Sequence, residues 1–169
     1  MRRAVSRLAK GLGVGGLALV AAVGALCGVG AALPAEHVAA EVATIPAAPD
    51  LVWARIVDFD HHEDWRTTVQ DVRAVGATVE EVDAWGDVLV LAVEERVEGE
   101  RLVLRVLGDG AFGGTWTVTL APDPAGTKVE IVERGVIRSP PLRVLAKAFF
   151  DPHATGRTWL ADLGRSFAR

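Results

Sequence analysis

The sequence predicts an α+β domain in which one amphipathic helix near the C-terminus covers the apolar face of a curved antiparallel sheet. Two patterns indicate this fold class. From about Thr67 to Arg138, short stretches alternate apolar and polar residues between turn residues, with no helix-length period. Beyond them, apolar residues recur at helical spacing to the end of the chain. Since 169 residues, half of them apolar, can bury one core but hardly two, we expect a single domain.

The domain is expected to begin with a strand and two short helical segments. HVAAEVATI, residues 37–45, alternates loosely, as a strand does, and ends before Pro46. Asp50 can cap a helix in which apolar residues recur at spacings of three and four up to about Asp58. HHEDW, residues 61–65, is expected to form a second helical turn that presents Trp65 to the core.

Strands joined by turns are expected in the middle of the chain. DVLVLAVEERV and RLVLRVL flank the turn residues EGE, and TWTVTL places Trp116, Val118 and Leu120 on one face and three threonines on the other. The loop PDPAG then leads into TKVEIVERGVI and completes a hairpin. This alternation predicts a sheet that faces water on one side.

The tail is expected to form the terminal helix. Asp151 and Pro152 interrupt its pattern, and we expect Asp151 to cap a fresh helix that Pro152 begins. The apolar residues on the shared helical face are Leu142, Leu145, Phe149, Gly156, Leu160, Leu163 and Phe167.

Residues 1–35 are expected to be a separate segment that precedes the domain at residues 36–169. Four cations within the first ten residues precede 23 uncharged residues, Gly11 to Leu33. As a helix this run would extend roughly 34 Å, enough to cross a membrane, and it is longer than the usual apolar region of a signal peptide. Seven glycines in the run, and small residues such as Ala32 and Ala35, keep a cleaved signal peptide as the alternative.

Charge bears on location and partners. Because the cations precede the apolar run, we expect a single-pass membrane protein with its domain on the extracytoplasmic side, or a secreted domain if the segment is cleaved. From Glu36 onward, 18 minus 4, or 14, Lys and Arg stand against 22 Asp and Glu, a net charge of −8. Cations and anions alternate within each segment, so nucleic acid and anionic lipid surfaces are expected to be poor partners.

Several stretches together resemble one family. The residues are PDLVWARIVDFDHHEDW, the hairpin GTWTVTLAPDPAGTKVEIVERG, and the ending SPPLRVLAKAFF followed by WLADLGRSF. In order and spacing they resemble the polyketide cyclase/dehydrase branch of the START-like, or SRPBCC, superfamily over about Glu41 to Ala168. The resemblance implies a helix-grip fold, in which a seven-stranded antiparallel sheet grips a long terminal helix around a deep apolar cavity.

The resemblance also implies a hydrophobic small molecule, such as a lipid or polyketide, as the ligand in that cavity. The argument for Phe149 and Leu160 is their inward helical face, and Gly156 between them would leave room for a ligand. The alternative is that Gly156 allows a close approach of helix and sheet. The residues expected to line the cavity are Trp65, Trp85, Trp116, Phe149, Gly156 and Leu160.

A binding protein is favoured over an enzyme. The superfamily has no universal catalytic residue to carry over, and the domain lacks Tyr, a common proton donor. The alternatives are a cyclase or dehydratase acting on a polyketide-like substrate, and a ligand-free protein-interaction module. No cofactor is expected, and a metal site is disfavoured because adjacent histidines in a helix project about 100° apart. If the domain is an enzyme, its candidate acid–base and charged residues are His61, His62, His153, Glu94, Arg96 and Glu133.

Overall fold

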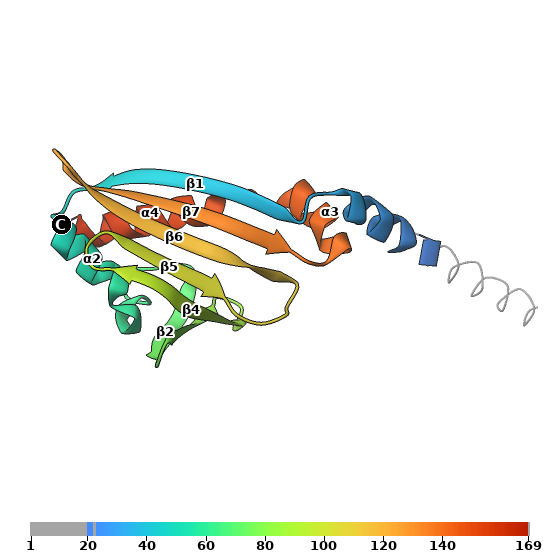
Figure 1. Ribbon diagram of the computed structural model, residues 1–169, viewed down its shortest axis with the longest axis horizontal. Helices are drawn as coiled ribbons and strands as arrows, with labels where there is room; N and C mark the ends of the chain where they lie inside the picture. Colours follow the sequence, from blue (N-terminus) through green and yellow to red (C-terminus); the bar gives the residue numbers. More distant parts are fainter. Residues whose placement is uncertain (1–19, 22, 169) are drawn as a thin grey trace, which may run out of the picture. The chain divides into compact units, whose positions relative to one another are not determined.

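The computed structural model describes residues 20, 21 and 23–168 (Figure 1). The chain divides into two compact units. The larger unit comprises Glu36–Val136 and Asp151–Arg169 and contains the sheet. The smaller unit comprises Met1–Ala35 and Ile137–Phe150. The candidate site lies wholly within the larger unit.

The larger unit is built on a seven-stranded curved antiparallel sheet with a C-terminal helix, as the sequence predicted. The strands follow the order β1-β7-β6-β5-β4-β3-β2, so the first strand pairs with the last, and Glu41 lies opposite Ile131. The strands are β1 (Glu36–Ile45), β2 (Val69–Val75), β3 (Thr78–Asp83), β4 (Val88–Val97), β5 (Arg101–Val106), β6 (Phe112–Asp123) and β7 (Gly126–Ile137).

The alternation of side chains sets the inner face of the sheet. On β6, Val118 and Leu120 are buried and Trp116 is half-buried, while on β5 Leu102 is buried and Arg101 is exposed. Burial of these apolar side chains, at roughly 25 cal/mol per Å² removed from water, favours this pairing register over one shifted by a residue. The core that results joins all seven strands with the helices that cover them.

Two helical segments connect β1 to β2. The helix α2 (Pro49–Val57) begins one residue before the predicted cap, and Ala48 occupies its N-cap without a side-chain hydrogen bond. Pro49 suits the first helical turn because its missing N–H would have no helical acceptor there. Asp50 therefore lies in the first turn, where its charge favours the helix dipole, and the prediction that it caps the helix was wrong. The 3-10 helix η1 (Phe59–His61) follows, and Trp65 is buried in the core as predicted.

The tail forms two helices, α3 (Pro140–Phe149) in the smaller unit and α4 (Ala154–Phe167) in the larger one. The predicted cap and start were off by two residues, because His153 occupies the N-cap of α4 and Asp151 accepts a hydrogen bond from its backbone N–H at 2.9 Å. The helix α4 packs against β1. Its Trp159, Leu160 and Leu163 are buried against the sheet.

The smaller unit pairs the described part of the N-terminal segment with α3. Residues 23–32 are helical, and the Arg143 guanidinium lies 3.4 Å from the Gly30 carbonyl oxygen and donates to Ile137 O at 2.7 Å. A Cβ at Gly30 would collide with the Pro140 carbonyl, so the two helices approach at a glycine. Among the described residues, no helix is long and apolar enough to cross a membrane. Residues 11–19 and 22 of the expected anchor lie outside the described part of the chain.

Candidate ligand cavity

An apolar cavity of about 280 Å³ lies within the larger unit. Strands β3 to β7 supply one wall, and α4 with the segment from α2 to Arg66 supplies the other. Its volume is near the lower end of the range for small-molecule sites. The apolar side chains that line it are Ile56, Phe59, Leu89, Leu91, Leu102, Leu104, Val106, Phe112, Trp116, Val118 and Trp159.

One end of the cavity carries a buried ion pair. Arg66, in the loop after η1, binds Glu81 of β3 through the two terminal nitrogens of its guanidinium. Nη1 donates to Oε1 at 2.5 Å, and Nη2 donates to Oε2 at 3.1 Å. The two side chains are 10% and 13% exposed, respectively. In a bidentate ion pair of this kind, each buried charge is neutralised by its partner although water cannot solvate it.

His62 adjoins this pair and is only 3% exposed. Its Nε2–H donates to the Ile56 carbonyl at 2.9 Å, which leaves Nδ1 to accept from Arg66 Nη1 at 3.3 Å. Burial and the nearby Arg66 charge lower the pKa of His62 to about 4, so the ring is neutral near pH 7. His61, its neighbour, points elsewhere and pairs with Asp58 on the surface. The two histidines therefore do not converge on one site.

A second polar group lines the cavity from β7. Three strands lie between Glu133 on β7 and Glu81 on β3 in the sheet order, and Glu133 Oε1 is 3.4 Å from His37 Nε2 on β1. Burial raises the pKa of Glu133 although the hydrogen bond to His37 opposes that shift. The cavity thus has a mostly apolar middle, and its charged residues Glu81 and Glu133 lie on β3 and β7, the strands next to the two edge strands of the sheet.

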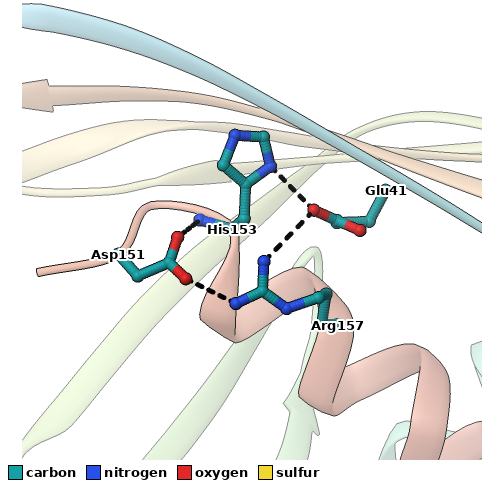
Figure 2. A network of polar contacts seen from close by, with 4 residues as sticks. All are labelled: Glu41, Asp151, His153 and Arg157. Atoms are coloured by element: carbon teal, nitrogen blue, oxygen red, sulfur yellow. Dashed lines mark hydrogen bonds and ion pairs between the residues drawn. The ribbon is translucent and has the colours of Figure 1, made fainter.

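A network of polar contacts fixes the start of α4 against β1 (Figure 2). His153 Nδ1 donates to Glu41 Oε1 at 2.7 Å, and Arg157 Nη1 lies 3.7 Å from the same oxygen. Arg157 also binds Asp151, which lowers the pKa of that exposed carboxyl. Because Thr155 and Trp159 line the cavity from the same helix, this clamp of Glu41, Asp151, His153 and Arg157 positions part of the cavity wall.

The residues predicted to bind the ligand occupy different places. Trp116 lines the cavity, whereas Trp65 and Leu160 are buried in the core, where Trp65 packs edge-on against Trp159. Trp85 lies at the turn between β3 and β4 and is 89% exposed, since Asp83 and Gly86 form a tight turn that directs it outward.

Phe149 and Gly156 are not among the residues that line the cavity. Phe149, in the smaller unit, is 82% exposed, because α3 is a separate helix and does not continue the buried face of α4. A Cβ at Gly156 would lie 3.1 Å from Glu41 Cγ. Gly156 therefore allows close approach of helix and sheet, the alternative that the sequence left open.

Sequence reasoning missed the Arg66–Glu81 pair. Arg66 directly follows the HHEDW turn, and Glu81 is the second of two consecutive glutamates in a strand, so either one resembles a surface charge. The one available signal was that Val79 and Glu81 share a face of β3, which places a carboxylate beside a buried valine. Of the candidate acid–base residues, Glu133 and His62 line the cavity, whereas Glu94 pairs with Arg105 on the exposed surface.

Comparison with known families assigns the chain. The family described as polyketide cyclase/dehydrase and lipid transport matches residues 36–163, which include the whole cavity. The chain belongs to this family. No match was found among curated proteins.

Solved structures agree on the fold of this polyketide cyclase/dehydrase family chain. A START superfamily protein from Mycobacterium smegmatis superposes with a TM-score of 0.62 at 13% identity, over 77% of this chain and 96% of that one. MLL2253 from Mesorhizobium loti gives 0.58 at 20% identity, over 76% and 95%. DynU16, a protein in the dynemicin biosynthetic locus, gives 0.57 at 20% identity, over 76% of this chain and 46% of its own.

Proposed function

We propose that the domain binds a hydrophobic small molecule, a lipid or a polyketide-like compound, in the cavity between the sheet and α4. The observation that carries this proposal is the cavity itself, a space of about 280 Å³ whose lining is mostly apolar. An empty apolar space costs stability because its walls lose packing contacts, so a retained cavity favours an occupant. The family description, which includes lipid transport, supports the same function.

The binding proposal can be tested on the full chain purified from its host. Organic extraction followed by mass spectrometry should release an apolar compound in near-equal amount to the protein. A folded chain that yields no such compound would count against binding as the resting function.

We also propose that the smaller unit attaches the protein to a membrane. It contains seven Lys and Arg and no Asp or Glu, whereas the larger unit contains 18 minus 7, or 11, Lys and Arg against all 22 Asp and Glu. A cationic unit suits an anionic membrane surface, although the sequence-based net charge of −8 from residue 36 onward had argued against one. The exposed apolar side chains of this unit are Val20, Val23, Leu26, Val29, Leu145, Phe149 and Phe150.

Membrane attachment and cleavage need separate measurements. Alkaline carbonate should leave the chain in the membrane pellet, with an intact mass that includes residues 1–35, if the apolar run is inserted, whereas a chain held by charge alone would be released at full length. Release into the supernatant with a shorter mass would support the cleaved signal peptide. The proposed anchor would place the ligand-binding domain on the extracytoplasmic side.

A second function, acid–base catalysis on a polyketide-like substrate, is favoured by one observation. Glu133 lines the cavity, and burial raises the pKa of its carboxyl, as is common for catalytic acids and bases. Turnover of such a substrate should then lose its pH dependence in the Glu133→Gln variant. Equal turnover in the variant and the native chain would remove Glu133 from this role.

A further inference from the structure

The Arg66 guanidinium keeps one edge unused. Of its five N–H groups, two on Nη1 and one on Nη2 are taken by His62 and Glu81. The Nε–H is buried and has no hydrogen-bond partner among the described residues. In a planar guanidinium the Nε–H and the outer Nη2–H lie side by side, so this edge offers two parallel donors.

Such a buried edge needs an acceptor, and the described residues supply none to the Nε–H. An unpaired buried donor carries the cost of losing its water, so a ligand oxygen there would gain a hydrogen bond that the empty protein lacks. Arg66 lines the cavity, as do His62 and Glu81. The acceptor can therefore come from a cavity ligand.

The surrounding charges select the kind of acceptor. Glu81 already neutralises Arg66, and His62 is bound in its neutral form between Arg66 and the Ile56 carbonyl. A ligand carboxylate would add an uncompensated negative charge near Glu81, whereas a carbonyl oxygen brings two lone pairs and no charge.

We propose that the free Nε/Nη2 edge of Arg66 binds a carbonyl oxygen of an otherwise apolar ligand. This inference rests on the proposed binding function and names the chemical group that the cavity recognises. Glu81 is a positioning residue here, because its two-point contact fixes the plane of the guanidinium. His62 completes the support by accepting from Nη1.

Two probes of matched shape test the proposal. In 2-acetylnaphthalene a carbonyl oxygen occupies the place of the terminal CH₂ group in 2-isopropenylnaphthalene. Equilibrium dialysis of the full chain in detergent, with a protein-free blank, gives the affinity for each. The two probes differ in their free energy of transfer from water, but this difference is the same for every protein variant. The measured quantity is therefore the ratio of the two affinities, which is compared between variants.

The double variant Arg66→Met with Glu81→Met removes the edge without leaving an unpaired charge. We expect the ketone-over-alkene ratio to fall on the order of tenfold, as for loss of one hydrogen bond to a charged group. Arg66→Lys, which keeps the charge but lacks the planar edge, should lower the ratio as well. Glu36→Gln, at an exposed glutamate of β1 outside the cavity lining, should leave the ratio unchanged.

The outcomes separate the two proposals. Equal ratios in the native chain, Arg66→Lys and the double variant would overturn the carbonyl site and leave cavity binding in place. A folded native chain that binds neither probe would count against cavity binding itself and would remove the carbonyl site with it. Circular dichroism of each variant verifies that the protein compared is folded.

Discussion

His62 shows how one buried side chain makes stability depend on pH. Its ordinary pKa of 6.5 falls to about 4 in the folded protein, chiefly through burial and then through Arg66. Between these two pH values the unfolded chain therefore binds more protons than the folded chain. The contribution of neutral His62 to the free energy of unfolding is fully present above pH 6.5 and is lost as the pH falls through 4. A pKa shift of this size corresponds to on the order of 3 kcal/mol.

We predict that the two adjacent histidines titrate far apart. At pH 5, His62 should remain neutral, whereas His61, whose pKa is raised by its hydrogen bond to Asp58, should be protonated. Nuclear magnetic resonance of the imidazole signals measures both in one sample, with His61 as the internal control. A His62 signal that titrates near 6.5 would contradict the buried neutral arrangement.

Two glycines of α4 face different surroundings. A Cβ at Gly164 would meet Ile45 Cδ1 at an ordinary 3.8 Å, but one at Gly156 would come within 3.1 Å of Glu41 Cγ. Alanine at either site gains helix propensity of roughly 0.5–1 kcal/mol, and at Gly156 crowding offsets this gain. Urea unfolding should therefore show Gly164→Ala to be more stable than Gly156→Ala. The reverse order would show that helix and sheet do not approach closely at Gly156.

The clamp in Figure 2 should govern opening at the start of α4. Replacing Glu41 with Ala removes the acceptor for His153 Nδ1 and one of the two carboxylates near Arg157. We predict that backbone hydrogen exchange over residues 154–157 accelerates by roughly tenfold, which corresponds to loss of about one hydrogen bond. Glu36→Ala, an exposed glutamate on the same strand, is the control. Unchanged exchange in Glu41→Ala would show that core packing alone seats the helix.

At the scale of the whole molecule, the sequence predicted the sheet because one-sided burial requires the alternation seen at Trp116, Val118 and Leu120. It also predicted a break at Asp151 and Pro152 with a fresh helix after it, and α3 and α4 are separate helices there. It did not predict that α3 belongs to a different compact unit from α4.

The candidate site was predicted less completely than the fold. Trp116 followed from strand alternation, but Arg66 and Glu81 are 15 residues apart, and their pairing depends on where the loop after η1 meets β3. Phe149 was chosen for its place on the predicted inward helical face, and Trp85 was named without such an argument. Neither helical spacing nor apolar character distinguishes a cavity wall from an exposed helix face or a turn.

The central claim is that the cavity is an occupied binding site, and native mass spectrometry of a cavity-filling variant tests it most directly. Leu104, half-buried on β5, lines the cavity, so Leu104→Trp should occupy the space that the ligand needs, while Trp85→Ala changes an exposed side chain. We predict a ligand-bound mass for the native chain and Trp85→Ala, and at least roughly tenfold less bound ligand for folded Leu104→Trp. Equal ligand occupancy in all three proteins would place the ligand elsewhere and contradict the claim.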